Sequence, residues 1–154
     1  MKIRLILLVS FLILPFFLFS QVKKSSNVYK LHNGNYYRVG KVVRENDWKF
    51  TTYVYKNKNG SDILVGKAYD GKAFLKNSNG KYKEAITIQR DGKTTKLYFF
   101  KNGNLIGKGS WMNEKIYKKT GYNFWDGYTY DLVGKIDGGG ENKSLGAALL
   151  LIYN

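Results

Sequence analysis

Apolar and polar residues alternate along short stretches of the chain, and turn-forming pairs separate these stretches. Residues 48–55 show the pattern: the even-numbered positions carry Trp, Phe, Thr and Val, and the odd-numbered positions carry Lys, Thr, Tyr and Tyr. A period of two residues predicts β-strands whose successive side chains point to opposite faces of a sheet.

The expected strands are short, and no stretch after the N-terminal segment shows a convincing helical period. They cover residues 28–32, 36–44, 48–56, 62–69, 72–76, 82–89, 94–101, 104–111, 114–118, 128–136 and 145–153. The last run is rich in Ala and Leu, which also favour helices, but it is short and we expect a buried closing strand. Residues 112–127 are the least regular part and predict a long loop or crossover.

Regular turns between short strands predict an all-β domain, an antiparallel meander of about ten strands over residues 28–154. We expect a barrel-like or strongly curved sheet, because a chain of this size without cysteine needs one enclosed core. The alternative is an open stack of β-hairpins, which would leave both sheet faces partly exposed.

One hairpin pattern occurs four times. A tyrosine lies five residues before the glycine of an Asn-Gly or Asp-Gly pair, and an aliphatic residue, glycine and lysine follow. The units follow one another at irregular intervals of 24 to 43 residues. The tyrosine, turn glycine and lysine of the four units are Tyr29, Gly34 and Lys41; Tyr55, Gly60 and Lys67; Tyr98, Gly103 and Lys108; and Tyr122, Gly127 and Lys135.

The residue types of the unit have physical reasons. A two-residue type I′ turn needs positive φ at both central positions, which Asn-Gly and Asp-Gly tolerate best. The glycine before the lysine predicts a β-bulge or a close backbone approach. If the units stack in register, the four lysines line up on one face.

These tyrosine-rich hairpins with Asn-Gly or Asp-Gly turns resemble the second, degenerate variant of the MORN-type repeat, best in residues 55–72 and 98–113. The resemblance covers less than half of the chain after residue 20. It implies a stack of hairpins that contacts proteins or membrane surfaces, and it implies no catalytic residue.

The first 20 residues have the layout of a secretory signal peptide. Lys2 and Arg4 precede an apolar run over residues 5–19, and Ser20 before Gln21 forms a plausible cleavage junction. We expect secretion, or a periplasmic or cell-envelope location, with no membrane span after cleavage; the alternative is that the segment stays as an anchor. Residues 21–27 are polar and predict a flexible leader.

The sequence lacks the residues that most kinds of catalytic site require. The chain has one histidine, His32, and no cysteine, so a catalytic triad or a zinc site lacks its residues, and we expect no metal and no cofactor. A pair of carboxylates, Asp126 with Asp131 or Asp62 with Glu84, is the remaining enzymatic possibility. We therefore expect no enzyme and assign no catalytic residue.

Cations and aromatic rings are abundant instead. The formal net charge is +15 at pH 7, and aromatic residues make up 16% of the chain. This combination predicts a non-catalytic binding module for an anionic polysaccharide, lipopolysaccharide or a protein partner, with nucleic acid still open. The alternative is a small barrel that carries an apolar ligand. The candidate binding residues are Lys41, Lys67, Lys108, Lys135, Trp111, Trp125 and Tyr128.

Overall fold

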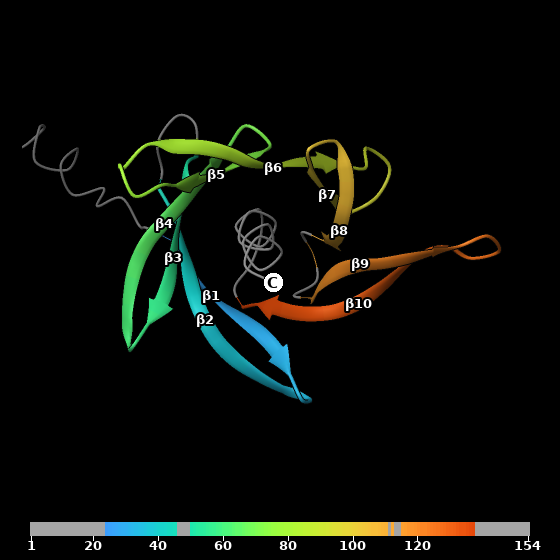
Figure 1. Ribbon diagram of the computed structural model, residues 1–154, viewed down its shortest axis with the longest axis horizontal. Coiled ribbons are helices and arrows are strands. Elements are labelled where there is room, and N and C mark those ends of the chain that lie inside the picture. The colour runs from blue at the N-terminus through green and yellow to red at the C-terminus, as the bar shows by residue number, and fades with distance from the viewer. Residues whose placement is uncertain (1–23, 46–49, 111, 113–114, 138–154) are drawn as a thin grey trace, which may run out of the picture.

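The computed structural model describes residues 24–45, 50–110, 112 and 115–137 of the chain, and these residues form ten antiparallel strands (Figure 1). The predicted all-β meander is therefore confirmed, and no helix occurs among the described residues. In chain order the strands are β1 (Lys24–His32), β2 (Asn35–Arg44), β3 (Thr52–Lys58), β4 (Ser61–Tyr69), β5 (Lys72–Lys76), β6 (Tyr82–Arg90), β7 (Lys96–Lys101), β8 (Asn104–Ser110), β9 (Lys115–Asn123) and β10 (Gly127–Ile136).

Each strand pairs with its neighbours in the chain, and β1 also pairs with β10, so the sheet closes into a barrel (Figure 1). The closing ladder joins Val28 to Ile136, Tyr29 to Lys135 and Lys30 to Gly134. Closure removes the two sheet edges that an open stack of hairpins would leave. The barrel-like alternative is thus the observed one.

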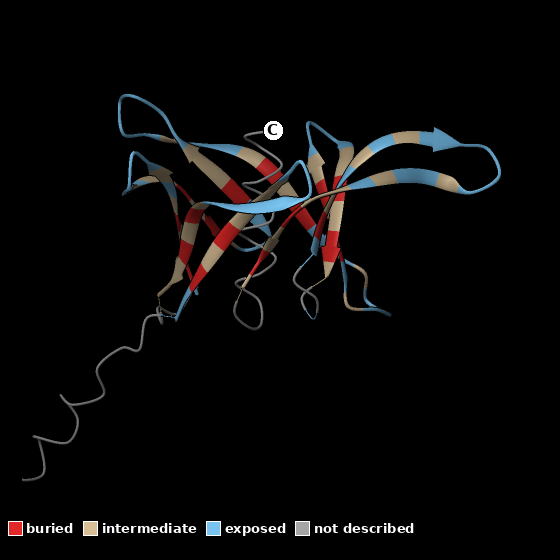
Figure 2. Cartoon of the chain, turned by 90° about the horizontal axis from the view of Figure 1, so that it is seen from below, coloured by how far each residue is buried: buried red, intermediate tan, exposed pale blue. Residues whose placement is uncertain are grey.

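Buried and outward positions alternate along the strands, and the buried positions gather in one cluster (Figure 2). Phe99, Ile86 and Leu97 are the largest side chains with almost no exposure. The strand pattern explains this, because side chains at every second position share the inner face. The cluster consists of Val28, Val42, Val54, Ala68, Ala73, Ile86, Ile88, Leu97, Phe99, Ile116 and Ile136.

The strands form five hairpins, and their five turns lie at one end of the barrel (Figure 2). In three of these turns an asparagine with φ of 48° to 51° precedes a glycine with φ of 77° to 85°, as type I′ geometry requires. These are the predicted turns at Asn33, Asn59 and Asn102. The connections between successive hairpins lie at the opposite end, because an antiparallel meander alternates its turns between the two ends.

One hairpin was not among the predicted units. It consists of β5 and β6, with Gly80 at its turn (φ 76°). Ala85, Ile86 and Thr87 occupy the places that an aliphatic residue, glycine and lysine hold in the other four hairpins. The turn glycines therefore follow one another at residues 34, 60, 80, 103 and 127, and the long interval in the sequence contains a fifth unit.

Two predicted boundaries were wrong. β1 begins at Lys24, and Ser26 is buried, so residues 24–27 belong to the sheet and not to a flexible leader. Residues 115–123 form the long strand β9, where the sequence predicted only a short strand over 114–118 and a loop up to residue 127. β10 agrees with the predicted strand over 128–136. The predictions for residues 1–20 and 145–153 fall outside the described residues.

Candidate functional site

A β-bulge interrupts the second strand of every hairpin. In β2, for example, Val28 pairs with Gly40 and Tyr29 pairs with Arg38, so Val39 is the extra residue. Four of the five bulges lie at the aliphatic-Gly step of the repeated unit, as the glycine predicted. The extra residues are Val39, Val65, Ala85, Ile106 and Val133.

The bulge explains the requirement for glycine at one position. A Cβ atom added to Gly40 would lie 2.1 Å from the carbonyl oxygen of Tyr55 on the next strand. Gly40 is buried, and Val39 packs against the core beside it. The residue after the glycine, Lys41, therefore points to the outside of the barrel.

The outward residue after each bulge stands directly opposite an aromatic residue of the next hairpin. Four of the five outward residues are lysines, and the same relation also joins the last hairpin to the first. We call these ten residues the outer belt. Its cross-strand pairs are Lys41 with Tyr55, Lys67 with Phe74, Thr87 with Phe100, Lys108 with Tyr117, and Lys135 with Tyr29.

The belt lysines lie over aromatic rings. The Nζ atom of Lys108 is 3.8 Å from the ring centre of Tyr130, and that of Lys67 is 4.4 Å from the ring of Tyr82. The Nζ atom of Lys135 is 5.0 Å from the ring of Tyr36. Cation–π contacts at exposed sites contribute about 0.5–1 kcal/mol each. These contacts hold the ammonium groups at defined places on the outer surface.

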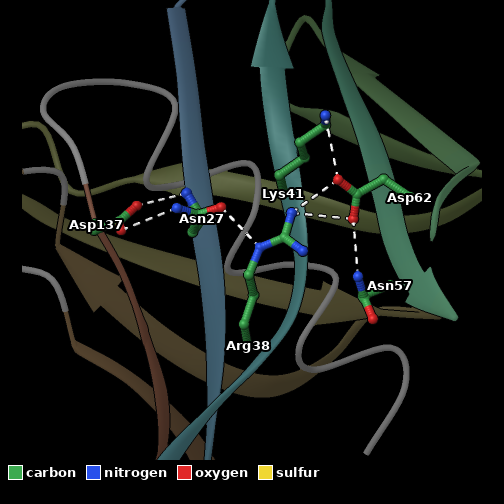
Figure 3. Close-up of polar contacts among 6 residues, drawn as sticks. All are labelled: Asn27, Arg38, Lys41, Asn57, Asp62 and Asp137. Carbon is green, nitrogen blue, oxygen red and sulfur yellow. Dashed lines mark hydrogen bonds and ion pairs between the residues drawn. The ribbon is translucent and has the colours of Figure 1, made fainter. Parts of the chain in front are cut away.

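Lys41 differs from the other belt lysines because it belongs to an ion-pair network (Figure 3). Asp62 accepts two hydrogen bonds from Arg38, of 2.8 and 3.0 Å, and lies 3.2 Å from the Nζ atom of Lys41. Hydrogen bonding to the Arg38 guanidinium lowers the pKa of Asp62 to about 2. Lys41 therefore has a carboxylate partner, which it shares with Arg38.

The same network also joins β1 to the end of β10, where the barrel closes. Arg38 also donates to the Oδ1 atom of Asn27, and Asn27 donates to Asp137 through its backbone N–H and its side chain (Figure 3). The Tyr29 hydroxyl donates to Asp137 over 3.1 Å, and this bond raises the pKa of Tyr29. The seam between β1 and β10 is thus fixed by polar contacts outside as well as by Val28 and Ile136 inside.

The other belt lysines, Lys67, Lys108 and Lys135, have no such carboxylate partner among the described residues. The β5–β6 hairpin differs again: it has Thr87 at the belt position, and its Glu84 pairs with Lys72 over 2.7 Å. Positive charge on the belt is therefore concentrated away from β5 and β6.

The four predicted lysines do not share one face. They lie on β8, β10, β2 and β4, which are alternate strands of the closed barrel, so they follow an arc over seven successive strands. Neighbouring members of this arc are separated by about 9–10 Å across the strands, since adjacent strands are about 4.8 Å apart, and they are also displaced by two residues along the intervening strand. An aromatic residue of the intervening strand lies between each pair.

The predicted aromatic residues lie elsewhere. Trp125 is 86% exposed and Tyr128 is 47% exposed, and both belong to the far end of the β9–β10 hairpin, where Phe124 joins them at 79%. Trp111 lies outside the described residues. Sequence reasoning missed Phe124, whose place beside the Asp-Gly turn was the available indication.

Three of the four carboxylates in the predicted pairs have local partners. Asp62 binds Arg38, and Glu84 binds Lys72 and accepts a hydrogen bond from Thr87. Asp126 accepts a hydrogen bond from Asn123 within the β9–β10 turn. In the part of the chain that the structure describes, no group of three or more His, Asp or Glu side chains is placed to hold a metal ion.

Comparisons with protein-family models, with curated proteins and with solved structures find no match for this chain. A search of the described residues finds no helix with the length and hydropathy needed to cross a membrane.

Proposed function

We propose that this chain is a secreted, non-catalytic binding module whose outer belt contacts an anionic polysaccharide of the cell envelope. The observation that carries the proposal is the regular repetition of outward lysines on alternate strands, each beside aromatic rings. Secretion itself rests on the pattern of residues 1–20 in the sequence.

The spacing of the lysines favours a polymer over a compact anion. A single phosphate or carboxylate ligand can reach one ammonium group or two, whereas Lys108, Lys135 and Lys67 are distributed over an arc of the barrel wall. A chain with anionic groups at repeated intervals can contact several of them at once. Linked contacts of this kind raise the overall affinity through effective concentration.

The aromatic rings favour a polysaccharide over a single-stranded nucleic acid. Unspecific nucleic-acid binding depends on bases that stack on free aromatic faces. In the belt, the ammonium groups of Lys108 and Lys67 lie over the rings of Tyr130 and Tyr82, at 3.8 and 4.4 Å. The tyrosine hydroxyls can instead exchange hydrogen bonds with sugar hydroxyls, and the lysines can pair with acidic groups.

The test compares a belt variant with a variant of equal charge. The belt variant is K67Q/K108Q/K135Q. The control K76Q/K83Q/K101Q removes the same number of charges from exposed positions outside the belt. Affinity is measured by calorimetry against heparin as an acidic polysaccharide, neutral dextran and single-stranded DNA, at several salt concentrations.

We expect the belt variant to bind heparin about tenfold more weakly, because three surface ion pairs of about 0.5 kcal/mol each sum to about 1.5 kcal/mol, and about 1.4 kcal/mol is a factor of ten. The salt dependence should also become shallower, since fewer counterions are released. Dextran should not bind. Equal losses in the two variants would show a general effect of net charge and would overturn the proposal, as would tighter binding of DNA than of heparin.

A further inference from the structure

The β9–β10 hairpin projects beyond the barrel wall as a two-stranded ribbon (Figures 1 and 2). β9 pairs with β8 only as far as Lys118, and β10 pairs with β1 only from Gly134 onward. Residues 119–131 therefore have each other as their only strand partners among the described residues. A two-stranded ribbon of this kind is marginally stable in water unless cross-strand side chains support it.

Four exposed aromatic residues gather at the end of this ribbon, and we call them the aromatic tip. They are Tyr122, Phe124, Trp125 and Tyr128, with exposed fractions of 65%, 79%, 86% and 47%. The rings of Tyr122 and Tyr128 pack edge to face, with 5.3 Å between their centres, and the rings of Phe124 and Trp125 pack in the same way, with 5.4 Å between their centres. A contiguous exposed apolar patch usually marks a contact surface.

Turn formation does not explain the two most exposed rings. The side chain of Asn123 accepts a hydrogen bond from the backbone N–H of Trp125 over 3.0 Å and donates to Asp126 over 3.3 Å. Gly127 supplies the positive φ of 76°. Asn, Asp and Gly thus carry the turn chemistry, and a polar residue at position 124 or 125 would serve the turn equally well.

The shape of the tip restricts its partner. The aromatic tip is the convex end of a narrow ribbon (Figure 2), so it cannot enclose a small ligand and needs a partner that surrounds it. We infer that the aromatic tip inserts into the interface of an anionic lipid bilayer and holds the barrel at the membrane surface. Tryptophan and tyrosine favour this interface because each joins an apolar ring to a polar group.

The lysines on the ribbon lie at a suitable distance from the tip. Lys119 and Asn123 are three steps of the ladder apart, because Thr120 is an extra residue in a bulge, and this is about 10 Å along a strand. Interfacial segments enter the boundary between headgroups and acyl chains by about 5–10 Å. With Trp125 at that depth, the ammonium groups of Lys118 and Lys119 reach the plane of the lipid phosphates. Asp131 stands opposite Lys118, so the charge of Lys119 is the one that favours anionic lipid there.

One group at the tip opposes insertion. Asp126 carries a negative charge beside Trp125, and its hydrogen bond from Asn123 keeps it within the turn. Near the headgroups this carboxylate repels anionic lipid. Replacing it with asparagine keeps an Asn-Gly turn and removes the repulsion, so D126N should bind anionic vesicles several-fold more tightly than the unaltered protein.

The experiment follows the fluorescence of Trp125 in a W48F/W111F variant, in which it is the remaining tryptophan. The exported protein, with its N-terminus determined first, is mixed with vesicles of phosphatidylcholine alone or with added phosphatidylglycerol. We expect the emission of Trp125 to shift to shorter wavelength with the anionic vesicles, and lipid-borne quenchers near the headgroups to reduce it. F124S/W125S, tested in the protein with all other tryptophans, should lower the partition coefficient at least tenfold.

The matched control is Y37S/I63S, which removes two exposed apolar side chains from other hairpins. It should keep the vesicle affinity, and all variants are first compared with the parent protein by urea unfolding. An unshifted Trp125 emission, or equal partition of F124S/W125S and the control, overturns the inference. A dimer that depends on Phe124 and Trp125 without vesicle binding would assign the tip to a second copy and overturn it as well.

This inference is independent of the polysaccharide proposal. The variant K67Q/K108Q/K135Q changes the belt and leaves the aromatic tip intact, so the Trp125 emission shift should persist in it. Loss of polysaccharide binding with a retained emission shift would separate the two surfaces.

Discussion

Replacing Gly40 with alanine tests the bulge that turns the belt lysine outward. A Cβ atom at this position would lie 2.1 Å from the carbonyl oxygen of Tyr55 and 3.2 Å from the Cα atom of Lys56. Both neighbours are backbone atoms, so no side-chain rotation relieves the contact. β2 and β3 must separate locally by about 1 Å, since contacts of a Cβ atom below 3.0 Å are essentially never observed.

The magnitude follows from the ladder that has to open. A separation of about 1 Å stretches a hydrogen bond of normal length beyond its useful range, and each bond contributes about 1 kcal/mol. Steric crowding in a packed region costs about 1–3 kcal/mol. Because Gly40 is at the end of the β2–β3 ladder, one or two bonds open, and G40A should lower the free energy of unfolding by about 2–5 kcal/mol.

The assay is urea unfolding followed by circular dichroism, with G109A as the matched control. Gly109 is also a buried strand glycine, but a Cβ atom there would meet the Phe99 ring at 3.5 Å, which is ordinary contact. We expect G40A to lower the unfolding midpoint by about 1 M or more. G109A should leave it unchanged or raise it, because alanine loses less conformational freedom than glycine. Equal midpoints in the two variants would refute the steric role of Gly40.

Three further outcomes are expected. The stability difference between the parent protein and D62N, about 1 kcal/mol at neutral pH, should shrink as the pH falls from 3.8 to about 2. A carboxyl with a lowered folded-state pKa stabilises the fold above its unfolded pKa and loses this effect on protonation. The unfolding free energies come from urea titrations, and a difference between the two proteins that does not change with pH would contradict the expectation. D137N should lower the pKa of Tyr29, because the bond that raises it disappears, and difference absorbance at alkaline pH measures the change. T87K/E84Q should bind heparin several-fold more tightly than E84Q alone, because it adds a fifth belt lysine opposite Phe100.

The turns could be predicted from the sequence because their chemistry is local. Asn33, Asn59 and Asn102 each precede a glycine, and each adopts the positive φ that this pair permits. The two strands of the β5–β6 hairpin were predicted, but the hairpin was not recognised as a repeat unit because Ile86 and Thr87 replace the glycine and the lysine. Its bulge at Ala85 preserves the register of the ladder, and register is a property of two paired strands that one strand's residue types do not reveal.

The first strand of the ribbon was missed for a different reason, whereas its second strand was predicted over 128–136. Both faces of residues 119–123 meet solvent, so the sequence there lacks the alternation that a half-buried strand shows. Polar residues and glycine in such a stretch look like a loop. Trp125 and Tyr128 were nevertheless singled out, because aromatic residues in polar contexts of a lysine-rich chain suit anionic partners that contain rings.

The tyrosines that repeat in the sequence are not all the aromatic residues that repeat in the belt. The predicted tyrosines were counted from the turn, but hairpin arms differ in length, so Tyr98 and Tyr122 do not hold the position that Tyr29 and Tyr55 hold. Counted from the bulge, that position belongs to Phe100 and Tyr117.

This register also explains closure. Each hairpin carries an aromatic residue on its first strand and, in four cases of five, a lysine on its second, so any hairpin can follow any other. Lys135 on β10 meets Tyr29 on β1 as Lys41 meets Tyr55, and Val28 meets Ile136 inside. The strand pairing that closes the barrel therefore has the same register as the pairing that links successive hairpins. The belt is a direct consequence of closing five such units into a ring.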